Sequence, residues 1–169
     1  MEALESKYIP LNYSELPFGI NIIEAHQGAG KTERIKDLSG WSYTIVVGAR
    51  RELGDSLLTR CKEMDFAHYE RISDNEELQT RKNLFICYPS LHRLNGKDWT
   101  RHTWDNLVID EVGLVFSSSF KWLPDHSNNE IFHKLINRTK RQLLVGAYIP
   151  KYVLSQIEKI KPQLQMTIT

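Results

Sequence analysis

Two short stretches of the sequence carry residue types suited to phosphate chemistry. The first reads AHQGAGKT over residues 25–32, and the second is the acidic pair that ends the run NLVIDE over residues 106–111. Glycines in the first stretch would let backbone N–H groups approach an anion closely, and a helix following it would add its dipole. The acidic pair, Asp110 and Glu111, could hold a metal ion and an attacking water. Together the two stretches indicate a nucleoside triphosphate site.

The first stretch departs from the G-x-x-x-x-G-K-[ST] pattern only at its first position, Ala25. That position starts the turn, where a small side chain suffices, and Gly28 and Gly30 give room beside the phosphates. Lys31 would reach the β- and γ-phosphates and Thr32 would bind Mg²⁺. We expect the nucleotide to be bound by Ala25, His26, Gln27, Gly28, Ala29, Gly30, Lys31 and Thr32. Two alternatives remain: His26 and Gln27 could face solvent, and the whole loop could be a strand–helix turn without a ligand.

The acidic pair follows an apolar run that reads as a strand, so it would lie at the carboxyl edge of a parallel sheet, where ligands bind. There Asp110 would hold Mg²⁺ through water, and Glu111 would orient and deprotonate the attacking water. The alternative is that Asp110 caps the next segment and Glu111 is a solvated charge. On the first interpretation the stretches are Walker A and Walker B motifs, with Lys31 and Glu111 as the catalytic residues.

Short apolar runs alternate with amphipathic stretches along the chain, which predicts βαβ units. The runs are continuous rather than alternating, as in strands covered on both faces. We expect an α/β fold with a mostly parallel sheet flanked by helices, in a single domain over residues 1–169. The expected strands are 19–25, 43–48, 84–88, 106–112, 142–148 and 164–169; the expected helices are 31–38, 50–64, 131–138 and 152–160; the expected loops are 73–82 and 123–129.

Composition narrows the class of protein. The chain has 169 residues, 41% of them hydrophobic, and a formal charge of +1, so a nucleic-acid site would have to come from a local basic cluster. Cys61 and Cys87 stand far apart, without metal-ligand spacing, which favours a reducing, intracellular setting. No apolar run approaches the length of a membrane span, so no membrane association is expected.

Three further stretches accompany AHQGAGKT in a recognisable order: IVVGARREL at 45–53, FICYPSLHRL at 85–94 and VIDEVGLVFSSSF at 108–120. Over about residues 20–160 this set resembles the first RecA-like domain of superfamily 2 helicases. It is most similar to the herpesvirus-type origin-of-replication-binding helicase and to related phage and plasmid replication helicases. The resemblance implies a RecA-like fold that binds ATP and Mg²⁺, hydrolyses ATP and binds single-stranded DNA, or RNA, across its strand ends.

The resemblance also implies roles for residues outside the two phosphate stretches. Arg50 and Arg51 would contact the nucleic-acid backbone, and Ser90, His92 and Arg93 would form the next motif facing the nucleic acid. Arginine forks suit phosphate oxygens, and hydroxyl groups add neutral contacts. Alternatively, the two arginines form a solvated helix start, and Ser90 and His92 belong to packing.

The sequence departs from this family at Gly146, Ala147 and Tyr148, where these helicases usually carry an acidic residue near the alanine. The second RecA-like domain, which supplies an arginine finger, is absent from these residues and is expected from a partner or from a longer protein. Two other functions stay open. One is a degenerate binding module of a replication complex, and the other is a small nucleoside kinase, although such kinases tend to carry a four-cysteine zinc ribbon.

Overall fold

A computed structural model describes residues 3–5, 12–26, 30–40, 42–116, 126–160 and 164–168. At its centre is an eight-stranded sheet with the order β1-β8-β2-β7-β6-β3-β5-β4, in which each neighbouring pair is parallel. The strands are β1 (Ala3–Glu5), β2 (Gly19–Glu24), β3 (Thr44–Gly48), β4 (Ala67–His68), β5 (Leu84–Cys87), β6 (Asn106–Asp110), β7 (Arg141–Gly146) and β8 (Leu164–Ile168). The predicted α/β fold is confirmed.

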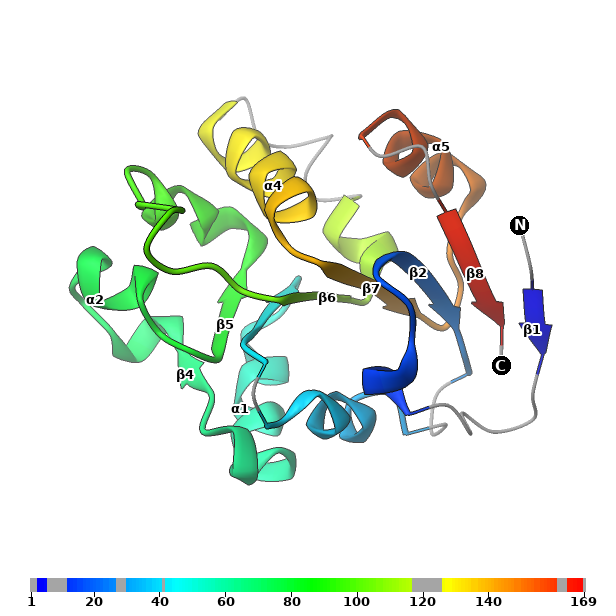
Figure 1. The fold of residues 1–169 in the computed structure, drawn as a ribbon, viewed down its shortest axis with the longest axis horizontal. Coiled ribbons are helices and arrows are strands. Elements are labelled where there is room, and N and C mark those ends of the chain that lie inside the picture. Colours follow the sequence, from blue (N-terminus) through cyan, green and yellow to red (C-terminus); the bar gives the residue numbers. More distant parts are fainter. Residues whose placement is uncertain are drawn as a thin grey trace.

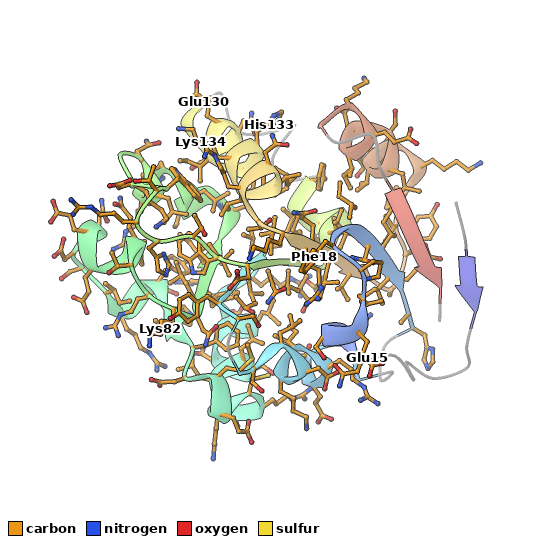
Figure 2. The ribbon with its side chains drawn as sticks, in the orientation of Figure 1. Glu15, Phe18, Lys82, Glu130, His133 and Lys134 are labelled. Atoms are coloured by element: carbon orange, nitrogen blue, oxygen red, sulfur yellow. The ribbon has the colours of Figure 1, made fainter. Side chains whose placement is uncertain are left out.

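Helices cover both faces of the sheet (Figure 1). The α-helices α4 (His126–Arg138) and α5 (Lys151–Ile160) lie on one side, and α1 (Arg51–Arg60) lies on the other. Every residue of β3, β5 and β6 is buried, which explains their continuous apolar runs. Figure 2 shows side chains filling the space between the helices and the sheet.

Shorter helical segments connect these elements. Among the described residues they are the α-helix α2 (Asn75–Gln79), a helical turn over 112–116, and the 3₁₀ helices η1 (Tyr13–Glu15), η2 (Glu33–Leu38), η3 (Lys62–Met64), η4 (Tyr69–Arg71) and η5 (Tyr88–Leu94). No helix in the described part of the chain is long and apolar enough to cross a membrane.

The predicted helix over 31–38 is present as the six-residue 3₁₀ helix Glu33–Leu38, and because it is so short its dipole adds little to anion binding. One local prediction was wrong. The segment 73–82 is not simply a loop, because it contains α2. The Asp74 side chain caps this helix by accepting the Glu76 N–H at 3.0 Å, and Leu78 anchors it in the core. Of the other expected loop, 123–129, residues from His126 onward belong to α4, and residues 123–125 lie outside the described ranges.

Helix α1 approaches the sheet closely at Gly54. A Cβ atom at this position would lie 2.3 Å from the Phe85 ring on β5 and 2.4 Å from the His68 ring on β4. Only glycine permits that approach, which holds α1 against the strands. The same helix carries Arg51 at its first residue and places Cys61 directly after its end.

Candidate functional site

The sheet topology collects the predicted site residues at one edge. Strands β2, β7, β6, β3 and β5 are consecutive neighbours and all parallel, so their carboxyl ends meet. The glycine-rich loop follows β2, Asp110 ends β6, and Arg50 lies between β3 and α1, as expected for a ligand site in an open parallel sheet. The segment with Ser90, His92 and Arg93 follows β5 in η5.

The glycine-rich loop is described at its two ends, since Gln27, Gly28 and Ala29 lie outside the described residues. Ala25 is buried, and its N–H donates to the Gly146 carbonyl of β7 at 2.9 Å, whereas His26 is exposed. Gly30 has a φ of +85°, a conformation that favours glycine. Lys31 Nζ donates to the Ala25 carbonyl at 2.7 Å and so lies back across the loop.

Asp110 and Lys31 form the electrostatic centre of this edge. Asp110 is 5% exposed, and burial, together with the nearby Glu111 charge, raises its pKa to about 6. The Glu111 N–H donates to Asp110 Oδ1 at 2.8 Å, and this bond and Lys31 oppose the rise in pKa. Burial lowers the Lys31 pKa, while Asp110 and Glu111 raise it. The three charges therefore lie close enough to influence one another.

The residues fit a magnesium ion bound together with a nucleotide. Within the described ranges no group of three or more His, Cys, Asp or Glu side chains could hold a metal on its own. Mg²⁺, however, needs only one or two protein ligands when phosphate oxygens and water complete its shell. A buried carboxylate with a raised pKa, such as Asp110, gains from a nearby cation. Thr32, on the loop, offers the hydroxyl that would accompany it.

Glu111 lies directly beyond Asp110 and faces outward. Its φ is +51°, in the left-handed region that non-glycine residues rarely adopt, so the backbone here is strained. Its carboxylate is half exposed, and Oε2 lies 3.9 Å from Arg50 Nε. A solvent-accessible carboxylate beside a buried metal-binding carboxylate can orient and deprotonate water.

Arg50 and Arg51 present their guanidinium groups to solvent. Arg50 pairs with the half-exposed Glu111 at 3.9 Å, and Arg51 pairs with Glu70 at 3.4 Å. Ion pairs in such exposed positions are worth about 0–1 kcal/mol, so an incoming phosphate can replace them. This geometry is compatible with the predicted contacts to a nucleic-acid backbone.

Arg93 behaves differently from the other two arginines. Its Nε donates to Asn75 Oδ1 at 2.7 Å and its Nη1 to the Tyr69 carbonyl at 2.8 Å, and Nη2 donates to the Ile72 carbonyl. The fork therefore holds the segment between β4 and α2, and only two of its five N–H groups are left. This bonding favours a structural role for Arg93 over the predicted nucleic-acid contact.

Ser90 and His92 occupy the same 3₁₀ helix as Arg93. The Ser90 residue is half-buried, whereas His92 is exposed. The His92 backbone N–H donates to Asn128 Oδ1 at 2.6 Å, and its Nδ1 lies 3.0 Å from the Pro89 carbonyl. The imidazole is thus oriented by the Pro89 carbonyl and remains accessible at the sheet edge.

Two residues that sequence reasoning missed contact the loop. The Tyr13 hydroxyl donates to the Lys31 carbonyl at 3.3 Å, and the Cys61 thiol lies 3.6 Å from the Thr32 carbonyl. Both come from elements distant in sequence, η1 and the end of α1, and neither belongs to a local pattern. Nothing short of the tertiary structure could have identified them.

Comparisons with known proteins reveal similarity in structure but not in sequence. No protein-family model and no curated protein matches the sequence. A DEAD box protein from the hyperthermophile Methanococcus jannaschii matches 96% of this chain and 48% of its own, at 17% identity and a TM-score of 0.66. A hypothetical ATP-dependent RNA helicase from Sulfolobus tokodaii matches 96% of this chain and 51% of its own, at 18% identity and a TM-score of 0.70.

A third structure extends the comparison. A chain from the Saccharomyces cerevisiae complex of Dbp5 with Nup159, Gle1, IP6 and ADP matches 95% of this chain and 46% of its own, at 15% identity and a TM-score of 0.67. The chain thus spans about half the length of the structures it matches. At this level of identity the likeness establishes the fold, which is the RecA-like α/β fold of helicase domains.

Proposed function

We propose that the chain is an ATP-binding, Mg²⁺-dependent ATPase domain of a helicase. The single observation that carries the proposal is the convergence of Lys31, Asp110 and Glu111 at one sheet edge, where their charges interact. A lysine at the end of a glycine-rich loop and a buried carboxylate suit a magnesium–triphosphate complex. If the loop were only a strand–helix turn without a ligand, nothing would compensate for burying Asp110, whose charged form is disfavoured there.

In this proposal each residue has one task. Lys31 would leave the Ala25 carbonyl and neutralise the β- and γ-phosphates, and Thr32 and Asp110 would hold the metal ion. Bound there, the metal would supply further neutralisation of phosphate charge. Glu111 takes a proton from the attacking water, which the half-exposed position of its carboxylate allows.

Nucleic acid is the second ligand that we propose. Arg50 and Arg51 are free to exchange their weak ion pairs for phosphate oxygens, and His92 lies exposed along the same edge. The fold likeness includes a DEAD box protein and a protein named as an ATP-dependent RNA helicase. We therefore extend the single-stranded DNA predicted from the sequence to single-stranded nucleic acid, with RNA as the first choice.

A second RecA-like domain is the proposed partner. Matched structures are about twice as long as this chain, which leaves room for such a domain in them. A pocket of about 370 Å³ beside Glu111 is lined by the exposed apolar side chains of Leu114, Tyr148 and Tyr152, on which such a domain could pack. Without that second domain, the proposed single domain over residues 1–169 would hydrolyse ATP slowly. The specific link to herpesvirus-type origin-binding helicases stays a prediction.

The test is ATP turnover by the purified chain with and without single-stranded RNA or DNA, beside Lys31→Ala and Glu111→Gln. We expect slow wild-type turnover, stimulation by nucleic acid, and loss of turnover in both variants. Binding of ATP without turnover under any condition would instead favour a regulatory binding module. Phosphate transfer to an added nucleoside would favour a small kinase, and no binding of ATP would reject the proposal.

A further inference from the structure

Tyr13 is buried where the N-terminal segment meets the glycine-rich loop. Its side chain is fully buried, and its hydroxyl donates to the Lys31 carbonyl at 3.3 Å. Its backbone N–H donates to Asp37 Oδ2 at 3.3 Å, on the 3₁₀ helix that follows the loop. A single residue thus joins η1 both to the loop and to the helix that the loop enters.

The contact with the Lys31 carbonyl has a directional consequence. A trans peptide group is planar, so its C=O and its N–H point in opposite directions. Fixing the Lys31 oxygen toward Tyr13 therefore aims the Thr32 N–H away from Tyr13. Among the described residues, the amide groups of Thr32 and Glu33 donate to no hydrogen-bond acceptor. Amide groups left free in this way are what an oxyanion requires.

Cys61 applies the same constraint to the next peptide group. Its thiol, fully buried after α1, lies 3.6 Å from the Thr32 carbonyl, which also accepts the Ile35 N–H at 3.2 Å, and these two contacts fix the direction of the Glu33 N–H. Tyr13 and Cys61 hold successive carbonyls, Lys31 and Thr32, from two different elements. Packing from outside the loop therefore helps to set the direction of these two amides.

Tyr13 is suited to act as a permanent donor. Burial raises the pKa of its hydroxyl far above the ordinary value, and Asp110 and Asp37 raise it further, so the phenol stays protonated. The segment that carries it is held from the other side by Arg141, which donates to the Leu16 carbonyl at 2.9 Å and to the Ser14 carbonyl at 3.1 Å. The hydroxyl is thus held in place before any nucleotide arrives.

We propose that Tyr13 is a positioning residue of the nucleotide site, whose hydroxyl orients the Lys31–Thr32 peptide group so that its N–H can receive a phosphate oxygen. The inference rests on the proposed nucleotide-binding function and adds a residue that no phosphate-loop pattern contains. Tyr13 does not touch the nucleotide. It acts through the direction of a backbone amide.

The experiment compares Tyr13→Phe with Tyr88→Phe by calorimetric titration of Mg²⁺–ATP into the full chain, with the thermal midpoint of each variant. Tyr88 is also buried and donates its hydroxyl to Asn129, but it lies in η5 rather than against the loop, so it is matched for the loss of a buried hydrogen bond. We expect Tyr13→Phe to weaken ATP binding about 3–10-fold. Tyr88→Phe should lower the midpoint without changing the affinity.

A purely structural role for Tyr13 would give equal affinities for wild type and Tyr13→Phe, and this result would overturn the inference while leaving the proposed function intact. Absence of binding by the wild type would reject both. Should Tyr13→Phe not fold, fluorotyrosine at position 13 keeps the packing and strengthens the donor. It is expected to tighten ATP binding, and an unchanged affinity would overturn the inference.

Discussion

Lys31 and Lys97 are two lysines withdrawn from solvent at opposite edges of the same sheet. Lys31 follows the carboxyl end of β2, whereas Lys97 precedes the amino end of β6 and is 7% exposed. Burial lowers the pKa of both ammonium groups, that of Lys97 to about 8. A lysine whose pKa is lowered by burial therefore does not by itself distinguish a functional site from a structural one.

The partners of the two ammonium groups differ. Lys97 Nζ donates to the Gln79 carbonyl at 2.7 Å, lies 3.1 Å from His102 Nδ1, and faces the rings of Trp104 and Trp99 at 4.8 and 5.4 Å. Carbonyl oxygen and aromatic faces satisfy a cation without inviting a ligand. The aromatic enclosure of Lys97 therefore has a structural role at the amino edge of the sheet.

At the carboxyl edge the charges are less completely matched. Lys31 has one carbonyl partner, and the carboxylates near it belong to Asp110, which is buried, and Glu111, which is strained. Both the cation and the anions would gain from a magnesium–triphosphate complex placed between them. The comparison teaches that unmet charge, rather than burial, marks the proposed site.

The largest effect on stability should come from Asp110→Asn. The Asp110 pKa of about 6 in the folded protein exceeds the ordinary 3.8, so the folded state binds more protons between these values, and wild-type stability falls as pH rises through that window. At pH 7 the amide should be more stable by about 3 kcal/mol. Chemical denaturation at pH 7 and below pH 4 checks this. A stability gain of Asp110→Asn that persists below pH 4 would contradict this explanation. Mg²⁺–ATP should also no longer stabilise the variant.

Lys97→Met probes the opposite edge. Folded Lys97 releases its proton near pH 8, whereas the unfolded chain holds it to about 10.5, so the unfolded state binds more protons in this range and wild-type stability rises with pH. That rise, of about 2 kcal/mol, should vanish in the variant. Denaturation midpoints at pH 7.5 and 10 measure the difference. Identical pH profiles for the two proteins would show that the enclosure does not disfavour the charged lysine.

Arg93→Ala and Arg50→Ala sharpen the comparison within the carboxyl edge. Loss of the Arg93 fork removes three hydrogen bonds, to two backbone carbonyls and an amide oxygen, so the chain should lose about 2 kcal/mol of stability. Arg50→Ala removes only an exposed pair and should cost less than about 0.5 kcal/mol, but it should weaken binding of single-stranded RNA. Denaturation and fluorescence anisotropy measure the two quantities. If Arg93→Ala kept normal stability but bound RNA more weakly, the result would support the predicted contact between Arg93 and nucleic acid.

Much of the sheet could be predicted from the sequence because its central strands are buried on both faces. β2, β3, β5 and β6 lie within the predicted runs and β7 begins one residue before its run, since a strand covered by helices must be largely apolar. The edge strands β4 and β1 were missed, because strands of two and three residues leave no periodic signal. α2 was missed for another reason: its charges concealed the one buried residue, Leu78, that anchors it.

The candidate site was predictable to the extent that it is local in sequence. The spacing around Lys31 and the pair Asp110–Glu111 are short patterns, and the parallel topology brings their strands to one edge. The bonding of Arg93 and the position of Tyr13 depend on contacts between distant segments, which no spacing encodes. Their roles became visible only once the chain was folded.

The most direct test of the contrast between the two edges is calorimetric binding of Mg²⁺–ATP at pH 7.5 to the wild type, Lys31→Met and Lys97→Met. We predict that the wild type and Lys97→Met bind with the same affinity and that Lys31→Met binds at least about tenfold more weakly, since it loses the phosphate-binding cation. Equal binding by Lys31→Met and the wild type, or no binding by the wild type, would contradict the account.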